Sequence, residues 1–277
     1  GSGKSTLLRL LKRELSPRGE LSGNITLMGK GRSELSARES AEKIGFVMQS
    51  PDSQTVCDKV SAELAFGLES FGVKSGEIQS RVGEMAAFFG IEPLYDRDIS
   101  TLSGGQKQLV ALCSVMATDP DILLLDEPTA QLDPVAAREL LGILDRLNKE
   151  MGVTIIIAEH DPEELFDSCD KILYLAKGKT EFFGTPALTA KYFVENALEG
   201  FLPETSKAFS GLCDDLPLNV RQGRAKLEKL GVTDIPKQAV NVADTKDKLI
   251  SLCNRPSHLI LHSKAGNIWV CSENNLF

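Results

Sequence analysis

The first six residues of the chain have the types and order that bind phosphate. They match the second half of the pattern G-x-x-x-x-G-K-[ST], in which backbone N–H groups at a helix start surround phosphate oxygens. Leucines at helical spacing follow directly, so we expect a helix behind the loop. A flexible start rich in glycine and serine could explain the first three residues but not the whole run. The candidate phosphate-binding residues are Gly1, Ser2, Gly3, Lys4, Ser5 and Thr6.

Two adjacent carboxylates follow a strongly apolar run. Ile122–Leu125 is continuously apolar and is followed by Asp126 and Glu127. Such a run indicates a parallel strand in a sheet covered on both faces, and these sheets bind ligands at the carboxyl ends of their strands. Neighbouring residues on an extended chain point to opposite sides, so we expect one carboxylate to hold Mg²⁺ and the other to orient water. A solvated turn is the alternative.

Three further candidates are ambiguous when each is taken alone. The run Ser103-Gly104-Gly105-Gln106 precedes a helical pattern and fits either a helix N-cap or an anion-binding helix start. Gln49 follows a strand predicted at 44–48, where a glutamine is commonly only a loop residue. His160 lies just after a strand predicted at 152–158, and a lone histidine is more often structural. Their functional interpretation depends on the presence of the other motifs.

These side chains require a sheet to position them. Short apolar or alternating runs predict strands, and apolar residues at helical spacing between 55 and 100 predict an inserted helical subdomain. The fold class expected from this alternation is α/β. The predicted strands cover residues 23–29, 44–48, 121–126, 152–158, 171–175 and 180–183.

Composition restricts the classes of function. The chain has 277 residues, of which 42% are hydrophobic and 25% charged, enough for one α/β domain with an appended segment. The net charge of −8 opposes binding to nucleic acid through phosphate neutralisation. Its apolar runs are far shorter than the roughly 20 residues of a transmembrane helix. Six cysteines without a CxxC pair favour reduced thiols in a cytosolic compartment.

Taken together, the motifs occur in the order of the ATP-binding cassette (ABC) ATPases, and the chain resembles that superfamily over about residues 1–192. The resemblance implies an α/β P-loop NTPase core with a helical subdomain at about 55–118. It also predicts that the core is truncated at its N-terminus, because the first glycine of the phosphate loop and its preceding strand are absent. The motifs that carry the resemblance are GSGKST, Gln49, LSGGQ, ILLLDEP, AQLD and His160.

The resemblance implies a role for each candidate. Residues 3–6 would bind the phosphates of ATP and Mg²⁺, with Ser5 as a metal ligand. Asp126 would hold Mg²⁺ through water, and Glu127 would be the general base. Gln49 would sense Mg²⁺ and the attacking water, and His160 would contact the γ-phosphate. Across an interface, the ATP held by a partner cassette would be covered by Ser103, Gly104, Gly105 and Gln106, with Asp133 crossing the same interface.

A finer resemblance concerns the type of transporter. Residues 46–54 and 65–69 look like the ATPase subunits of energy-coupling-factor importers of vitamins and metals. Residues 84–91 and 130–133 are similar to the form in which two such ATPases are fused in tandem. Residues 216–224 resemble its interdomain linker. We therefore expect a linker over 193–270, and the start of a second cassette at 271–277.

This resemblance implies partners and a location. The partners are a second ABC cassette, fused or separate, and integral membrane transport subunits, with no nucleic acid expected. The protein would lie peripherally on the cytoplasmic face of the cell membrane and hydrolyse ATP to energise import. The alternative is a soluble, non-transport ABC ATPase of the translation or DNA-repair type. That alternative predicts basic linkers or long coiled-coil insertions, and neither is visible in the sequence.

Overall fold

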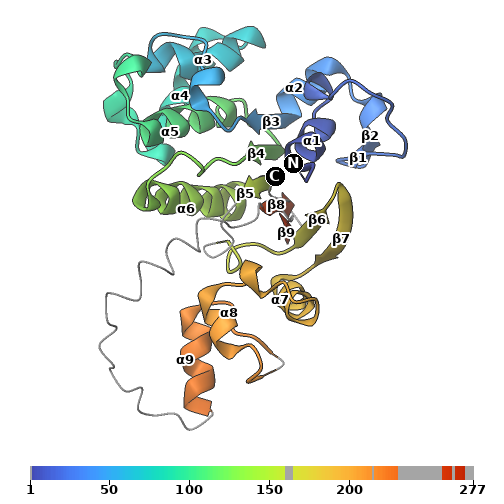
Figure 1. The fold of residues 1–277 in the computed structure, drawn as a ribbon. Coiled ribbons are helices and arrows are strands. Elements are labelled where there is room, and N and C mark those ends of the chain that lie inside the picture. The colour runs from blue at the N-terminus through green and yellow to red at the C-terminus, as the bar shows by residue number, and fades with distance from the viewer. Residues whose placement is uncertain (1, 160–164, 214, 230–257, 264–265, 272–277) are drawn as a thin grey trace.

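The computed structural model describes residues 2–159, 165–213, 215–229, 258–263 and 266–271. Within these residues the central feature is a mixed sheet with the strand order β3-β4-β5-β8-β6-β7. Figure 1 shows this sheet between a group of helices above it and a second group below it. Its strands are β3 (Ile44–Val47), β4 (Ile122–Asp126), β5 (Thr154–Glu159), β6 (Ile172–Ala176), β7 (Lys179–Gly184), β8 (His258–Ser263) and β9 (Gly266–Cys271).

The sheet has a parallel half and an antiparallel half. Strands β3, β4 and β5 run parallel, so their carboxyl ends meet at one edge. Strands β6 and β7 form an antiparallel hairpin. Strand β8 lies between β5 and β6 and runs antiparallel to both, while β9 pairs with β8. Candidate residues that follow β3, β4 and β5 therefore share one end of the sheet.

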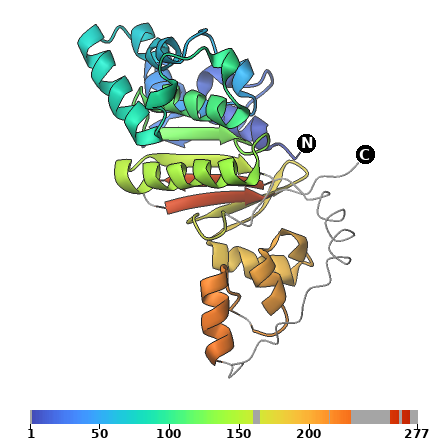
Figure 2. The ribbon, with the colours of Figure 1, turned by 90° about the vertical axis from the view of Figure 1, so that its left-hand side faces the viewer.

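The helices cover both faces of the sheet and extend beyond it. Three of them, α3, α4 and α5, lie between β3 and β4 in sequence and form the upper group in Figure 1. Helix α6 lies along the sheet in Figure 2. The helices are α1 (Lys4–Leu11), α2 (Ala37–Lys43), α3 (Val60–Ser70), α4 (Ser75–Phe89), α5 (Gly104–Met116), α6 (Pro134–Met151), α7 (Pro186–Glu195), α8 (Glu204–Phe209) and α9 (Val220–Lys229).

Short elements complete the described chain. A small hairpin of β1 (Thr26–Leu27) and β2 (Lys30–Gly31) replaces the longer strand predicted at 23–29. The left-handed backbone of Met28 and Gly29 turns the chain back on itself there, so the strand ends early. Single 3₁₀ turns occur at Arg13–Leu15, Arg32–Glu34, Pro51–Ser53, Glu92–Leu94, Ile99–Thr101 and Glu199–Phe201.

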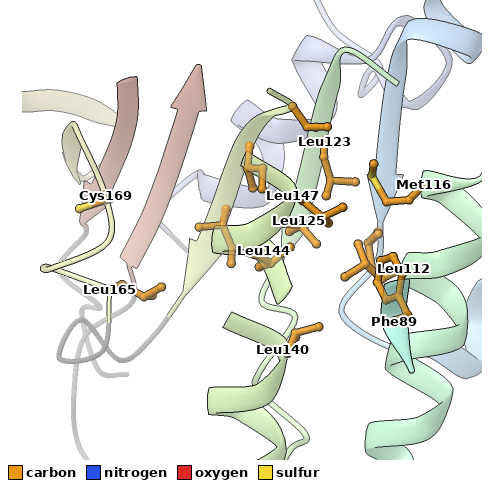
Figure 3. Packing of buried hydrophobic residues seen from close by; sticks show 14 of the residues in the cluster. Phe89, Leu112, Met116, Leu123, Leu125, Leu140, Leu144, Leu147, Leu165 and Cys169 are labelled. Atoms are coloured by element: carbon orange, nitrogen blue, oxygen red, sulfur yellow. The ribbon is translucent and has the colours of Figure 1, made fainter. Parts of the chain in front are cut away.

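Strand β4 is buried along its whole length because it packs on both faces. Leu124 belongs to a cluster that includes Leu8 of α1. Leu123 and Leu125 face the opposite side and join a larger cluster with residues of α5 and α6. Figure 3 shows Leu123 and Leu125 among the side chains of that cluster. This confirms the sequence-based prediction of a parallel strand covered on both sides.

Close contact between β3 and α5 depends on a glycine. A Cβ atom on Gly45 would lie 2.5 Å from the Val115 side chain and 3.3 Å from that of Leu123. Only a residue without a side chain lets α5 approach the strand this closely. The inserted helices are thereby packed directly on the strand that leads to Gln49.

Among the residues that the structure describes, none of the helices combines the length and the hydrophobicity of a membrane span.

Candidate functional site

The phosphate-loop residues stand at the start of α1. Gly3 has φ 96°, a left-handed conformation that glycine adopts readily, and Lys4 is the first residue of the helix. Leu8, a residue of this helix, is fully buried and anchors the helix in the core. Ser2 and Lys4 are only 5% and 6% exposed. The first turn of α1 is thus held rigidly at the end of the sheet, with its backbone N–H groups at the helix start.

The structure brings five of the predicted site residues together. Ser5 Oγ donates a hydrogen bond to Asp126 Oδ1 at 2.8 Å. Lys4 Nζ lies 3.6 Å from Glu127 Oε1 in an ion pair. Gln49 Nε2 donates to the other oxygen of Glu127, Oε2, at 2.7 Å. The start of α1 and the ends of β3 and β4 therefore converge on a pair of carboxylates.

Burial changes the electrostatics of this group. It lowers the pKa of Lys4, and the negative charge of Glu127 opposes that shift. Burial also raises the pKa of Asp126, against the hydrogen bond from Ser5, which favours the ionised carboxylate. Burial thus disfavours the charged form of both side chains. A negative charge next to Lys4 and a positive charge next to Asp126 would each offset this effect.

The extended geometry predicted for the two carboxylates is wrong at the second of them. Strand β4 ends at Asp126, and Glu127 has φ 51°. A left-handed non-glycine residue is strained by about 1 kcal/mol or more, so the surroundings must impose it. The Glu127 N–H still donates to the carbonyl of Ala158 at 2.8 Å, in continuation of the ladder between β4 and β5, so the chain leaves the strand direction only after this N–H. As a result both Asp126 and Glu127 contact residues of the phosphate loop and the helix behind it.

The residues present fit a bound phosphate and a magnesium ion. Ser2 Oγ is buried and has no hydrogen-bond partner among the described residues, although buried polar groups are normally paired. Lys4 adds a buried positive charge beside it. Mg²⁺ is commonly bound by one or two carboxylates together with substrate phosphates rather than by a complete protein cage. Ser5 and Asp126 supply such a partial set.

The second predicted anion site is the start of α5. Ser103 Oγ accepts a hydrogen bond from Gln106 N at 3.3 Å, and Gln106 Oε1 accepts one from Ser103 N at 3.0 Å. These reciprocal bonds form a capping box, so the N-cap interpretation of this sequence is confirmed. The cap does not exclude an anion site, because helix-start N–H groups of Gly104 and Gly105 have no intrahelical acceptor.

The loop that carries Asp133 lies beside this helix start. A Cβ atom on Gly105 would lie 3.3 Å from that of Ala136, and one on Gly104 would lie 3.9 Å from the carbonyl oxygen of Gln131. Asp133 itself caps α6, and its Oδ1 accepts bonds from Val135 N at 2.9 Å and Ala136 N at 3.0 Å. These bonds lower the pKa of Asp133. The two segments predicted to meet a partner cassette are therefore neighbours.

Two predicted residues fall outside this description. Gly1 and His160 lie outside the described residues. Thr6 is the third residue of α1 and is exposed.

Two contacts were not predicted from the sequence. Glu159 Oε1 accepts a hydrogen bond from Thr129 N at 2.8 Å, within the loop after Glu127. Gln54 bonds the backbone of β3 and its exit, because its Oε1 accepts from Met48 N at 2.9 Å and its Nε2 donates to Phe46 O at 3.2 Å. The position of Glu159 directly after the apolar run 155–158 could have indicated the first, but its acceptor role depends on long-range pairing.

Comparisons with known proteins identify the family and the fold. A family model described as ABC transporter matches residues 1–130. The solved structure of cbiO1 from Clostridium perfringens, described as part of the ABC transporter complex cbiONQ, is 35% identical to the chain. The match has a TM-score of 0.63 and covers 72% of this chain and 79% of that one. The chain belongs to the ABC transporter family. Its fold is that of a P-loop ABC ATPase, as predicted.

Other relatives of this cassette are also transporter ATP-binding proteins. A putative ABC transporter ATP-binding protein of Bacillus thuringiensis subsp. konkukian is 37% identical over 253 residues, which are 91% of this chain and 46% of that protein. The energy-coupling factor transporter ATP-binding protein EcfA1 of Lacticaseibacillus paracasei is 40% identical over 187 residues, 68% of this chain and 66% of EcfA1. The cassette thus spans about half the length of the first curated relatives it matches. A translation or DNA-repair ATPase is not favoured by these likenesses.

A further solved structure is a dimer. The ATP-binding cassette MJ0796, solved in a post-hydrolysis state bound to ADP and Pi, is 26% identical with a TM-score of 0.57. The match covers 67% of this chain and 81% of that one.

Proposed function

We propose that this cassette binds and hydrolyses ATP to energise an energy-coupling-factor importer of a vitamin or metal micronutrient. The observation that carries the proposal is the convergence of Lys4, Ser5, Gln49, Asp126 and Glu127 at the carboxyl ends of parallel strands. The likeness to EcfA1 and cbiO1 supports the type of importer. The protein would act peripherally on the cytoplasmic face of the membrane.

Residues of the phosphate loop bind the substrate in this mechanism. The N–H groups at the start of α1 and the Lys4 ammonium bind the phosphates of ATP, with Gly1, Ser2 and Gly3 forming the loop and Thr6 in the first turn of α1. Ser5 and Asp126 would hold Mg²⁺, which neutralises phosphate charge when bound. Lys4 forms an ion pair with Glu127. A phosphate that binds Lys4 therefore weakens the attraction between Lys4 and the Glu127 carboxylate.

Glu127 is the proposed general base. Its carboxylate, released from Lys4, accepts a proton from the water that attacks the γ-phosphate. Gln49 donates a hydrogen bond to the same carboxylate and therefore fixes its direction. His160, the residue after β5, is proposed to contact the γ-phosphate. Positioning and charge stabilisation supply most of the catalysis in phosphoryl transfer, so a rigid base and lysine are the main requirements.

A second cassette, fused or separate, is the proposed partner at the start of α5. Ser103, Gly104, Gly105 and Gln106 would cover the ATP held by the partner, and Asp133 would lie at the same interface. The support is the position of α5, whose helix-start N–H groups adjoin the Asp133 loop. We further propose that residues 193–270, which include the β8–β9 hairpin, connect this cassette at 1–192 to a second one starting within 271–277. The greater length of the curated relatives supports this.

A groove beside the inserted helices is the proposed contact with an integral membrane transport subunit. The groove has a volume of about 310 Å³ and is lined by residues of α2, β3, α3 and α5. Val56 and Phe66 at this groove are 64% and 42% exposed, so they add apolar surface that a partner would cover. Gln54 lines the groove and also bonds the strand that leads to Gln49. A displacement of groove residues can thereby be transmitted through β3 and Gln49 to Glu127, the proposed base.

The test is hydrolysis by a Glu127→Gln variant of the natural protein that contains residues 1–277. We expect turnover to fall by about a hundredfold or more, because general acid–base catalysis contributes roughly 10²–10⁴-fold, while MgATP binding is retained. A matched control is Glu77→Gln, which removes an exposed carboxylate that pairs with Arg81 on α4. Turnover in Glu127→Gln equal to that of the control would rule out Glu127 as the base.

A further inference from the structure

A buried carboxylate next to the site has no role in the mechanism above. Glu159 is the last residue of β5 and is 1% exposed. Its Oε1 accepts a 2.8 Å hydrogen bond from the backbone N–H of Thr129. A buried carboxylate is expensive to remove from water, so it is normally kept where its hydrogen bonds fix something. Here it fixes the loop that begins with the proposed base.

The end of β5 holds this loop at two points. The carbonyl of Ala158 accepts from Glu127 N at 2.8 Å, and the side chain of Glu159 accepts from Thr129 N at 2.8 Å. Between these two contacts lies the left-handed residue Glu127, with φ 51°. A strained residue persists only where its surroundings over-determine the backbone. The carbonyl of Ala158 and the carboxylate of Glu159 fix the backbone on either side of this strained rotation.

The same loop continues in tight turns to the start of α6. Ala130 N donates to Glu127 O at 3.2 Å, and Leu132 N donates to Thr129 O at 3.0 Å. Asp133 then caps α6. Residues 127–133 are therefore a compact unit, and the Glu159 side chain ties its middle to the sheet. A shift of Thr129 would move Glu127 at one end and the Asp133 interface segment at the other.

We propose that Glu159 is a positioning residue for ATP hydrolysis, whose hydrogen bond to Thr129 N keeps the Glu127 carboxylate between Lys4 and Gln49. The inference rests on the proposed function, because it assigns Glu159 a task only if Glu127 is the base. Glu159 acts through its acceptor oxygen at the right distance. The charge of Glu159 also raises the pKa of Lys4, but less than the charges of Glu127 and Asp126 do, so we expect a neutral acceptor of equal length to substitute for it.

Three variants of the natural protein that contains residues 1–277 test this. Glu159→Gln retains an acceptor oxygen of the same reach. Glu159→Asp retains the charge but shortens the side chain by one methylene, and Glu159→Leu removes the acceptor at similar size. We expect Glu159→Gln to keep kcat within about threefold of the parent, while Asp and Leu substitutions lower kcat by about tenfold to a hundredfold, the scale of a 1 Å misplacement. The KM for ATP and the Kd for MgATP stay within about threefold in all of them, because the phosphate loop is unchanged.

A matched control separates positioning from loss of stability. Ser206→Ala removes another buried side-chain bond to the backbone, the 2.7 Å bond from Ser206 Oγ to Pro217 O in the region of α8. It should lower Tm without changing kcat. If Glu159→Leu fails to fold, the contrast between the Gln and Asp variants carries the test.

Two results would overturn the inference. One is a folded Glu159→Asp or Glu159→Leu variant that binds MgATP and keeps the parent kcat. The other is a Glu159→Gln variant as impaired as Glu159→Asp, since charge rather than the acceptor would then be essential. A parent protein that binds but never hydrolyses ATP would instead refute the proposed function, so the two failures are distinguishable.

Discussion

Ser103 offers a test in which one substitution, Ser103→Asp, should preserve or raise stability while it lowers activity. In the structure its Oγ accepts a bond from Gln106 N at 3.3 Å and caps α5. In the proposed function the same residue faces the phosphate of ATP on a partner cassette. An aspartate at position 103 is an equally good N-cap but adds a negative charge, whereas an alanine removes the cap without adding charge.

The magnitudes follow from these two roles. Loss of an N-cap costs about 1 kcal/mol, within a range of about 0.5–2, so Ser103→Ala should lower Tm by about 2–4 °C. Ser103→Asp keeps the cap and places a carboxylate at a helix N-terminus, which is worth about 0.3–1 kcal/mol, so its Tm should equal or exceed that of the parent. Hydrolysis should fall modestly in Ser103→Ala. In Ser103→Asp it should fall by more than about tenfold, because two negative charges would face each other.

The assay is thermal unfolding and steady-state hydrolysis on the same preparations. The expected order is Asp, then parent, then Ala for Tm, and parent, then Ala, then Asp for kcat. If the Asp variant hydrolysed ATP as fast as the parent, Ser103 would be a helix cap with no part in the interface. Hydrolysis that followed Tm across the three proteins would lead to the same conclusion.

Two further predictions concern the groove and the outer surface of the cassette. Gln54→Leu removes the hydrogen bonds to Met48 N and Phe46 O, so we expect weaker co-purification with the membrane subunit and an unchanged affinity for MgATP. The control is Gln79→Leu, which changes an exposed residue of α4. An equal yield of complex from the two variants would contradict this prediction. Backbone and lysine contacts lower the pKa of exposed Glu39 from 4.5 to about 2, so its stabilising effect is present above about pH 4.5 and is lost as the pH falls towards 2. The Tm difference between parent and Glu39→Gln should therefore shrink over that interval, and a constant difference would refute the assignment.

Much of the site could be predicted because its signals are local. The apolar run before Asp126 identifies a buried strand, and the glycine, lysine and serine at 3–5 coincide with a helix start, where anion binding was predicted. Ser103 and Gln106 are spaced for a capping box, which depends only on residues three apart. Such patterns need no knowledge of tertiary contacts. The strands and their common edge followed from them.

The remaining features depend on contacts between distant segments. The left-handed turn at Glu127 directly follows a bond from its N–H to Ala158, a residue of another strand. The acceptor role of Glu159 requires Thr129 to lie beside the end of β5. Likewise, no local pattern indicated that β8 would pair between β5 and β6. Register and pairing of this kind are set by tertiary packing rather than by sequence periodicity.

In the proposed function, this cassette supplies the base for one ATP and the covering helix start for another. Sedimentation of the Glu127→Gln form with and without MgATP tests it directly, because bound ATP cannot be hydrolysed and should hold two cassettes together. We expect MgATP-dependent pairing of cassettes, and we expect that adding Ser103→Asp abolishes the pairing while each cassette still binds MgATP. Pairing that does not depend on MgATP, or that survives Ser103→Asp unchanged, would contradict the proposed arrangement.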